Sequence, residues 1–334
     1  MPSEVAQPAV RESGAPRLDA AIRTATGVRY PRGAVWRKWD LHVHAPGTKL
    51  NDNYTKRDGA LDWDRFCREI EESDVAAIGI TDYFSFASFF AFTAAHHARY
   101  PESSKVFFPN LELRLNEAVN SAAEEVHLHL IFSPTLTEAK AETFLRALPT
   151  EIRVENGRAL PCFELDSATH YGSATVTRAS IRAAIQATFG DRAVSQNHLL
   201  VVTSCKNDGI RPESGRLRKE NLTDEIDKFS DGFFGNSGSR DYFLSTDRFE
   251  DSTQKSHPKP VFGGCDAHRF EDLADWLGRS IDTEHQRKEV TWVKADLTFD
   301  GLRQTLIEPE HRVALQPQQP DLKDPYKYIA RVRF

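Results

Sequence analysis

The chain has 334 residues, 40% of them hydrophobic, which is enough for one large α/β barrel or two smaller domains. Its 43 basic and 49 acidic residues leave a formal net charge of −6, which excludes a global attraction to nucleic acid or anionic membranes. No run of about 18 apolar residues occurs, so a membrane-spanning helix is excluded and we expect a cytoplasmic protein. The four cysteines are scattered without C-x-x-C spacing, which indicates neither a disulfide framework nor a thiolate zinc site.

The first part of the chain predicts an arm followed by strands and helices. Residues 1–30 are rich in Ala, Pro, Arg and Ser and indicate a loosely held arm, with at most one short helix near residues 18–24. Apolar runs predict strands, and apolar residues at helical spacing predict a helix. We expect strands at 36–45, 75–83, 105–115 and 126–133, and a helix at 64–73.

Five phenylalanines stand between residues 84 and 92. Three of them, Phe86, Phe89 and Phe90, fit a helical stripe that faces the core. No lysine or arginine is interleaved with them, as a base-stacking platform would require. The segment therefore predicts packing rather than nucleic-acid binding.

The second part of the chain continues the alternation of strands and helices. We expect helices at 138–148, 177–188, 220–229, 269–277 and 299–307. We expect strands at 199–205, 231–234, 260–268 and 290–296. Residues 156–172 form an insertion, and residues 235–240 predict a turn-rich loop. After the strand at 199–205 come Lys206 and the basic stretch 211–219, which predict either a phosphate-binding loop or a solvated mobile one.

Metal-competent side chains cluster at the ends of the predicted strands. Three pairs have members two positions apart in the chain: His42 and His44, His127 and His129, and Asp266 and His268. Such spacing places both members on one face of a strand. The ends of parallel strands in a closed barrel meet on one face, where barrel enzymes place their chemistry. We therefore expect these pairs to share one site.

Two carboxylates extend this set of candidates. Asp82 ends the strand at 75–83, in the same layout as the first histidine pair. Glu112 is flanked by leucines in the next strand, so it is either a paired structural carboxylate or a ligand. Cys265 precedes Asp266 and is interpreted as a small buried filler.

Four motifs together resemble the PHP (polymerase and histidinol phosphatase) superfamily. They are Asp40-Leu-His-Val-His44, Gly79-Ile-Thr-Asp-Tyr83, Pro109-Asn-Leu-Glu-Leu113 and Gly264-Cys-Asp-Ala-His268. The resemblance implies a distorted (β/α)7 barrel over residues 31–312, with the N-terminal arm, loop insertions and a C-terminal extension at 313–334. Residues 291–309 narrow the likeness to the N-terminal domain of TrlF-like PHP-ATPase proteins.

The resemblance also implies a metal site. The first ion would be held by His42, His44, Glu112 and Asp266. Glu112 would bridge to a second ion with His129, which is preferred over His127. One or two divalent ions, Zn, Mn or Fe, suit these ligands. His268 is a candidate proton donor, phosphate contact or further ligand, and Asp82 is a further catalytic candidate. Lys206, Arg211 and Arg269 each follow a strand end and are candidate phosphate contacts.

Two departures from the family pattern bear on the number of ions. The family motif usually reads Thr-Asp-His, whereas Tyr83 stands here. A ligand expected near Ser204 is also missing. Phenol and hydroxyl groups are poor ligands for zinc, so we expect a third ion site to be empty or weak.

The resulting functional hypothesis is a metal-dependent phosphoesterase, a nuclease or nucleotide hydrolase. No Gly-x-x-x-x-Gly-Lys-Ser/Thr loop occurs, so an AAA or SMC-like ATPase would be a partner, and anti-phage defence is the implied setting. The alternatives are a small-molecule phosphatase and a non-catalytic, metal-stabilised docking module. No membrane is expected as a partner.

Overall fold

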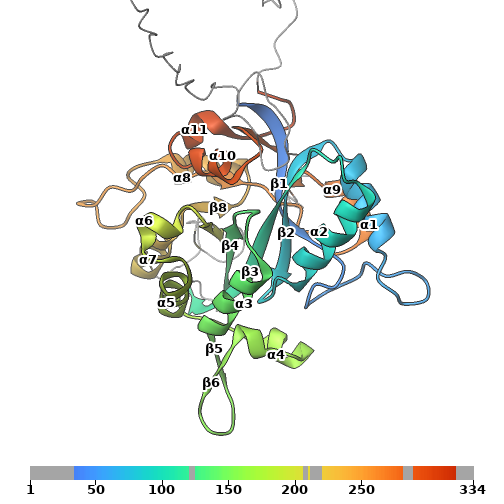
Figure 1. The fold of residues 1–334 in the computed structure, drawn as a ribbon. Coiled ribbons are helices and arrows are strands. Elements are labelled where there is room, and N and C mark those ends of the chain that lie inside the picture. The colour runs from blue at the N-terminus through green and yellow to red at the C-terminus, as the bar shows by residue number, and fades with distance from the viewer. Residues whose placement is uncertain (1–33, 120–124, 206–209, 211–219, 281–288, 321–334) are drawn as a thin grey trace, which may run out of the picture.

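The computed structural model describes residues 34–119, 125–205, 210, 220–280 and 289–320. Within this part of the chain, seven strands form a nearly closed ring (Figure 1). The strands follow one another as β1 (Val35–His44), β2 (Val75–Tyr83), β3 (Val106–Ala118), β4 (Glu125–Phe132), β7 (Leu199–Ser204), β8 (Gly232–Phe234) and β9 (Val261–Phe262).

The chain after β9 returns to β1 and almost closes the ring. Val43 forms a parallel bridge with Ala267, and the His44 N–H donates to the Ala267 carbonyl at 3.2 Å. The expected mixed α/β architecture with a barrel-like sheet is therefore confirmed. The carboxyl end of β1 thereby lies beside the segment that follows β9.

One strand of the ring runs against the others. β4 is antiparallel to both β3 and β7, whereas the remaining neighbours in the ring are parallel. The expectation that all the ligand-bearing strands are parallel is wrong at this strand. The first half of β4 lies beside the second half of β3, so His129 is paired with Glu112 and His127 with Arg114.

Three further strands extend the sheet beyond β1. They are β10 (Arg279–Ser280), β11 (Glu289–Ala295) and β12 (Val313–Gln316), of which β11 pairs with β1 and both others pair with β11. The expected C-terminal extension was placed from residue 313. Its first four residues belong to the sheet, because β12 pairs with β11 over its whole length.

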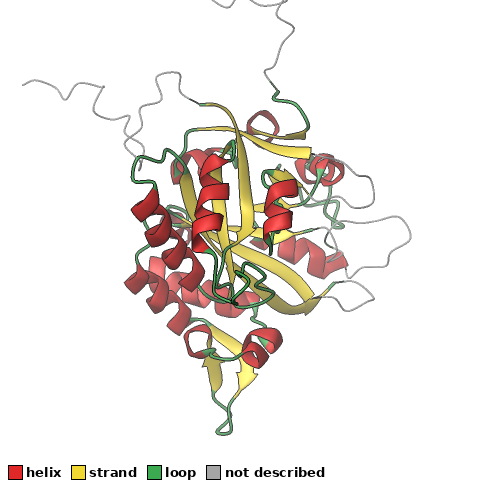
Figure 2. Cartoon of the chain, turned by 90° about the vertical axis from the view of Figure 1, so that its right-hand side faces the viewer, coloured by secondary structure: helices red, strands yellow, loops and turns green. Residues whose placement is uncertain are grey.

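Helices surround the ring on its outside (Figure 2). Their bounds are α1 (Trp63–Glu72), α2 (Ala87–Arg99), α3 (Glu138–Ala147), α4 (Ala168–Ser173), α5 (Arg178–Phe189), α6 (Arg192–Ser195), α7 (Glu220–Phe229), α8 (Ser237–Leu244), α9 (Phe270–Trp276), α10 (Phe299–Gln304) and α11 (Pro309–Arg312). No helix in the described ranges is long and apolar enough to cross a membrane.

The expected loop at 235–240 is wrong, because α8 begins at Ser237. The Ser237 N–H donates to Glu289 Oε2 at 2.8 Å, and the Ser237 hydroxyl contacts the other oxygen of this carboxylate. A carboxylate at a helix N-terminus satisfies free N–H groups and favours the helix. Glu289 comes from β11, so this cap leaves no local trace in the sequence.

The apolar stripes of the helices pack against the ring as their spacing predicts. Phe66 and Ile70 of α1 are buried, together with Val75 at the start of β2. Phe86 and Phe89 are buried too, which confirms their core role, although Phe86 lies one residue before α2 begins.

The insertion between α3 and α5 is an ordered unit that projects from one end of the ring (Figure 1). It contains β5 (Pro149–Arg153), β6 (Ala159–Pro161), a 3-10 helix (Cys162–Glu164) and α4. The guanidinium of Arg114 on β3 donates to the carbonyls of Tyr171 and Gly172, and the Val176 N–H donates to the Arg114 carbonyl. The insertion is thus anchored on β3, next to the position of His127.

Several predictions lie outside the described residues. They are the arm at 1–30 with its short helix near 18–24, the basic stretch 211–219 with Arg211, Lys206, and residues 321–334.

Candidate metal centre

Four predicted ligands from three parts of the ring meet at one point. Alternation along β1 turns His42 and His44 to the same face, and Glu112 reaches them from β3. Glu112 Oε2 lies 3.4 Å from His42 Nε2 and 3.2 Å from His44 Nε2. Asp266 Oδ1 lies 3.1 Å and 3.4 Å from the same two nitrogens. Ligands of a tetrahedral zinc ion, each about 2.0–2.1 Å from it, are about 3.3–3.4 Å apart.

Three of these atoms are buried without hydrogen-bond partners. His42 Nε2, His44 Nε2 and Glu112 Oε2 have none among the described residues, and neither does the buried His129 Nε2. One unsatisfied buried polar atom costs about 1–3 kcal/mol, and four in one place demand a shared partner. A divalent cation satisfies imidazole nitrogens and a carboxylate oxygen together, so the residues present fit a metal ion.

Neighbouring side chains fix the orientation of two of the imidazoles. The Thr48 hydroxyl lies 3.1 Å from His44 Nδ1 and donates to Asp82 Oδ1 at 3.2 Å. Thr48 therefore accepts the Nδ1 proton of His44. Likewise the Asn110 amide oxygen lies 3.1 Å from His129 Nδ1. With the proton on Nδ1, each Nε2 keeps a lone pair for a metal ion, as is usual for metal-binding histidines.

The amide of Asn110 is itself held in place. Its Nδ2 donates to the Leu41 carbonyl at 2.8 Å and to the Thr81 hydroxyl at 3.0 Å. The opposite face of the amide thus presents its oxygen to His129. Thr48 and Asn110 were missed by the sequence reasoning, although Asn110 stands two residues before Glu112 on the same strand and so shares its face.

Asp82 lies behind the cluster rather than on its open side. Its Oδ1 accepts hydrogen bonds from the Thr48 hydroxyl, the Lys49 N–H at 2.8 Å and the Tyr83 N–H at 2.9 Å. Its Oδ2 accepts from the Ser88 N–H at 3.4 Å. Burial raises the pKa of this carboxyl above its ordinary value. The surroundings of Asp82 therefore indicate that it positions Thr48 instead of touching a substrate.

Asp40 has a similar supporting place at the start of the first motif. Its Oδ1 accepts from the N–H groups of His42 at 3.1 Å and Cys265 at 3.3 Å, and its Oδ2 accepts from Gly278 at 2.8 Å. Burial raises the pKa of Asp40 to about 6, against the lowering effect of these N–H donors. Asp40 ties the segment after β9 to β1. Cys265 is fully buried beside it, as expected of a filler.

Asp266 reaches the cluster through a turn, not a strand. The expected strand geometry through His268 is wrong, because β9 ends at Phe262 and Asp266 has a φ of 49°. A Cβ on Gly264 would lie 2.5 Å from the Cβ of His42, so only glycine permits this close approach. The turn still brings Asp266 Oδ1 to within 3.3 Å of His268 Nε2.

The second histidine pair is divided between the interior and the rim. His127 Nδ1 lies 2.7 Å from Glu112 Oε1, and its side chain is 40% exposed. His129 is buried, with its ring 4.4 Å from that of His42. Burial holds the pKa of His129 well below its ordinary value, which favours the neutral form that binds metals. Glu112 thus divides its two oxygens between His127 and the β1 pair, the arrangement expected of a bridging carboxylate.

The two departures from the family pattern lie close to the site. The Tyr83 ring stacks on His44 at 4.7 Å between centroids, and its hydroxyl is 3.5 Å from His268 Nε2. His268 also stacks on His44, with the two ring centroids 4.0 Å apart. Ser204 ends β7 and is half-buried. Its neighbour across the ladder, Phe234, was also missed by the sequence reasoning and lies 5.2 Å from the His42 ring.

Of the three predicted phosphate contacts, the described residues include Arg269, which does not contact the clustered ligands. Arg269 is exposed and directly precedes α9, and its Nε lies 3.0 Å from Oδ1 of Asp272 in the first turn of that helix. Lys206 and Arg211 lie outside the described residues. These three assignments stay predictions.

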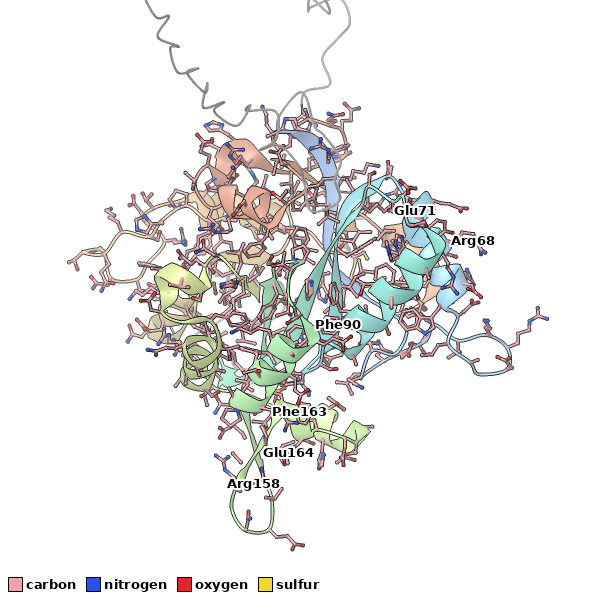
Figure 3. The ribbon with its side chains drawn as sticks, viewed as in Figure 1. Arg68, Glu71, Phe90, Arg158, Phe163 and Glu164 are labelled. Carbon is pink, nitrogen blue, oxygen red and sulfur yellow. The ribbon has the colours of Figure 1, made fainter. Side chains whose placement is uncertain are left out.

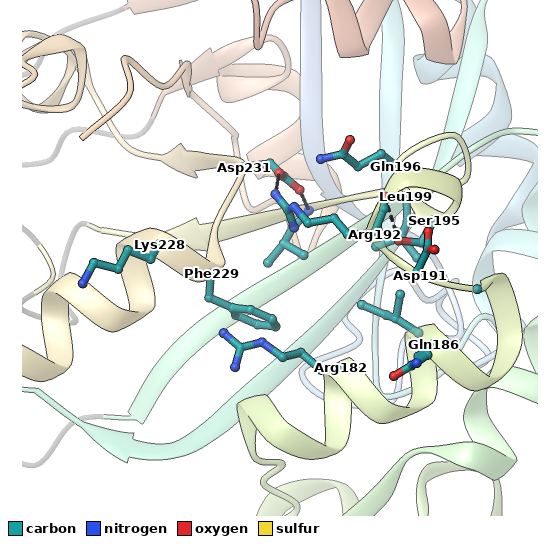
Figure 4. Close-up of a pocket in the computed structure, with 13 residues that line it drawn as sticks. Arg182, Gln186, Asp191, Arg192, Ser195, Gln196, Leu199, Lys228, Phe229 and Asp231 are labelled. Carbon is teal, nitrogen blue, oxygen red and sulfur yellow. Dashed lines mark hydrogen bonds and ion pairs between the residues drawn. The ribbon is translucent and has the colours of Figure 1, made fainter. Parts of the chain in front are cut away.

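A separate cavity of about 340 Å³ lies between α5, α6 and α7 (Figure 4). The Arg192 guanidinium lies 2.6 Å from Asp231, and the Arg182 guanidinium covers the Phe229 ring at 4.9 Å (Figure 4). None of the predicted metal ligands is among the residues that line this cavity. It is therefore not the opening of the metal centre.

Comparison with known proteins gives matches among solved structures alone. No family model matches the chain, and no curated protein does. A protein of Bifidobacterium adolescentis, provisionally described as a metal-dependent phosphoesterase, is 15% identical with a TM-score of 0.36, over 74% of this chain and 98% of that one. A two-domain protein of Bacteroides vulgatus, containing a predicted PHP-like metal-dependent phosphoesterase, is 13% identical with a TM-score of 0.45, over 85% of this chain and 65% of that one.

The ring of seven strands and the ligands gathered at one of its ends agree with the barrel that the sequence motifs predicted. The insertion between α3 and α5 lies at the end of the ring where the ligands meet, since Arg114 anchors it two residues beyond Glu112.

Proposed function

We propose that this PHP-like domain is a metal-dependent phosphoesterase. One observation carries the proposal: donor atoms of His42, His44, Glu112 and Asp266 converge within 3.1–3.4 Å, and three of them are buried without a hydrogen-bond partner among the described residues. Packing alone does not stabilise such a convergence of polar atoms. A divalent ion held by these residues supplies Lewis acidity toward a phosphoryl oxygen.

The open side of the cluster suits a substrate. Asp266 has a side chain that is 53% exposed, whereas Glu112 and His44 are buried. A purely structural metal site is closed on all sides, and a catalytic one keeps a position that solvent can reach. The exposure of Asp266 therefore favours catalysis over the alternative of a non-catalytic docking module.

Two side chains that can donate a proton or hydrogen bond, His268 and Tyr83, lie at the rim of the cluster. His268 Nε2 lies 3.3 Å from Asp266 Oδ1 and 3.5 Å from the Tyr83 hydroxyl. Both groups are fixed by stacking against or near His44. We assign to His268 the donation of a hydrogen bond or proton to an oxygen of the phosphoester, and to Tyr83 the orientation of His268.

The substrate class follows from the motif resemblance and is a nucleotide or nucleic acid, with a small-molecule phosphate ester as the alternative. The net charge of −6 gives no general attraction to a polyanion, so contacts to the phosphate must be local. An AAA or SMC-like ATPase partner and a role in anti-phage defence are proposals on the same basis.

Metal analysis followed by a phosphoester screen tests the function. The purified protein should contain a divalent metal ion and hydrolyse at least one phosphoester, and chelation should stop turnover. The screen should compare oligonucleotides of several lengths, mononucleotides and sugar phosphates, because length dependence separates a nuclease from a phosphatase. Stable metal binding without turnover of any phosphoester would favour the docking module instead.

A further inference from the structure

An open cavity of about 580 Å³ lies between α2, α3 and the insertion. Pockets for small ligands usually enclose about 300–1,000 Å³. Its walls are largely apolar and carry aromatic rings from three parts of the chain. The rings of Phe84, Phe86 and Tyr171 are buried, whereas those of Phe90 and Phe163 are partly exposed. Phe90 on α2 and Phe163 in the insertion are labelled in Figure 3. Phe163 is 39% exposed, unusual for so large an apolar side chain.

The cavity adjoins the candidate metal centre through two chain segments. Tyr83 packs its ring against His44, and the next residue, Phe84, lines the cavity. Thr48 contacts His44 Nδ1, and the next residue, Lys49, also lines the cavity. Consecutive Cα atoms are about 3.8 Å apart. Phe84 and Lys49 therefore each lie next to a residue that contacts the predicted metal ligand His44.

Phe84 occupies its wall position with an unusual backbone. Its φ of 53° is rare for a bulky side chain, and its N–H donates to the Glu112 carbonyl at 3.0 Å. In the described ranges this left-handed conformation occurs at two other non-glycine residues, Asn51 and the predicted ligand Asp266. Strained backbone tends to be kept where function requires it, and here two cases flank one site.

The charges around the cavity give a ligand its orientation. Two carboxylates, Glu138 and Glu142, lie in the α3 wall and repel a phosphate group. Lys49 is the cationic side chain among the lining residues; its Nζ lies 5.6 Å from the centre of the Tyr171 ring, and it makes no ion pair within the described part of the chain. An uncharged planar ring stacks well on aromatic walls, and its phosphate would be drawn toward Lys49.

We propose that this cavity binds the nucleobase of a nucleotide whose phosphoester lies at the metal centre. The inference rests on the proposed phosphoesterase function for the place of the phosphate. The base pocket itself does not depend on turnover and is testable without it.

A substitution on the outer wall can fill the cavity without disturbing the core. Ala91 lines the cavity from an exposed position of α2, so Ala91→Trp places a large side chain in the space. Ala98 is exposed on the same helix two turns later and does not line the cavity. Ala98→Trp is therefore a matched control for helix propensity and surface hydrophobicity. Equal melting temperatures for the two variants would show that both fold.

The decisive experiment is calorimetric titration of the purified protein with adenosine, which lacks a phosphate. Stacking of one base contributes enough that its loss should weaken binding at least about fivefold. Wild-type protein and Ala98→Trp should bind adenosine alike, and Ala91→Trp should bind it at least about fivefold more weakly. Equal adenosine affinity in both variants, or no binding to the wild type, would overturn the proposal.

A kinetic comparison separates this inference from the proposed function. Adenosine 5′-monophosphate and ribose 5-phosphate are phosphomonoesters with and without the base. Relative to Ala98→Trp, Ala91→Trp should lower kcat/KM for adenosine 5′-monophosphate at least about fivefold. It should leave kcat/KM for ribose 5-phosphate unchanged. If the wild type hydrolyses neither compound while the adenosine titration gives the expected difference, the pocket stands and the phosphoesterase proposal loses its support.

Discussion

Thr48 stands behind His44 and determines which of its nitrogens faces the metal centre. The Thr48 hydroxyl donates to Asp82 and so accepts the Nδ1 proton of His44 at 3.1 Å, leaving Nε2 directed at Glu112 and Asp266. This short chain of hydrogen bonds joins the loop after β1 to the end of β2. The loop after β1 and the end of β2 thereby hold the His44 imidazole in one orientation.

The first prediction is that Thr48→Val weakens metal binding. Valine has a similar volume but no hydroxyl, so His44 loses the acceptor that fixes its Nδ1 proton. Loss of such an outer contact usually lowers metal affinity about 10–100-fold. Competition titration with a chromophoric chelator measures the change, and Thr48→Ser, which restores the hydroxyl, is the control. Equal affinity in wild type and Thr48→Val would show that the contact is incidental.

The second prediction concerns the ligands themselves. His42→Ala or Asp266→Ala should remove the bound metal and lower turnover by about 10³-fold or more, while the protein stays folded. Both side chains lie at the end of the ring rather than in its apolar clusters. Asp247→Ala, at an exposed carboxylate paired with Lys255, is the matched control. Turnover at the wild-type rate in chelator-treated protein would exclude a metal-dependent mechanism.

Much of the ring could be predicted from the sequence because its strands are buried on both faces and read as apolar runs. The bounds expected for the second strand, residues 75–83, are those of β2. The reversed direction of β4 could not be predicted, since an apolar run such as residues 126–133 does not encode the direction of its neighbours. The helix that begins at Ser237 was missed for a similar reason, because its cap, Glu289, is 52 residues away.

The candidate site, too, could be predicted from the sequence only in part. Residue type and spacing indicated His42, His44 and Asp266, since few other roles need such side chains at strand ends. The supporting residues were invisible, because threonine and asparagine are common and only the fold brings Thr48 to His44 and Asn110 to His129. The left-handed turn at Asp266 was also unpredictable, since it follows a close approach of Gly264 to His42 that only the fold creates.

The third prediction is that one to two metal ions bind per chain, a range that follows from the number of imidazole and carboxylate ligands. Tyr83 stands where the family pattern has histidine, and burial raises the pKa of its phenol, which disfavours the phenolate that would bind a metal. Tyr83→His should add a ligand next to His268, whose Nε2 is 3.5 Å from the present hydroxyl, and raise the metal content. Elemental analysis of both proteins measures this. Three fully occupied ions in the wild type would contradict the prediction.

The last prediction concerns stability away from the site, at a buried ion cluster that fastens the segment before β9 to α7. The Arg248 guanidinium contacts both oxygens of Asp227 at 2.7 Å and 2.9 Å, and the Lys259 ammonium lies 2.8 Å from one of them. Arg248 also donates to the carbonyls of Phe243 and His257. Asp227→Asn leaves two buried cations without their anion, which should lower the free energy of unfolding by about 3–5 kcal/mol at neutral pH.

The pH dependence of this effect has a definite sign. Burial alone raises the pKa of Asp227, but the hydrogen bonds from Arg248 and the charge of Lys259 outweigh burial and lower the pKa below its ordinary value of 3.8. A carboxylate with a lowered pKa stabilises the folded state above its unfolded pKa, and this stabilisation is lost as the pH falls through the folded pKa. Urea unfolding should therefore show a wild-type advantage over Asp227→Asn that is constant near neutral pH and shrinks below about pH 4. Glu142→Gln, which breaks an exposed pair with Arg146, is the control and should cost only about 0.3–0.5 kcal/mol. If Asp227→Asn lowered the free energy of unfolding by as little as the control does, the buried ion cluster would not stabilise the fold.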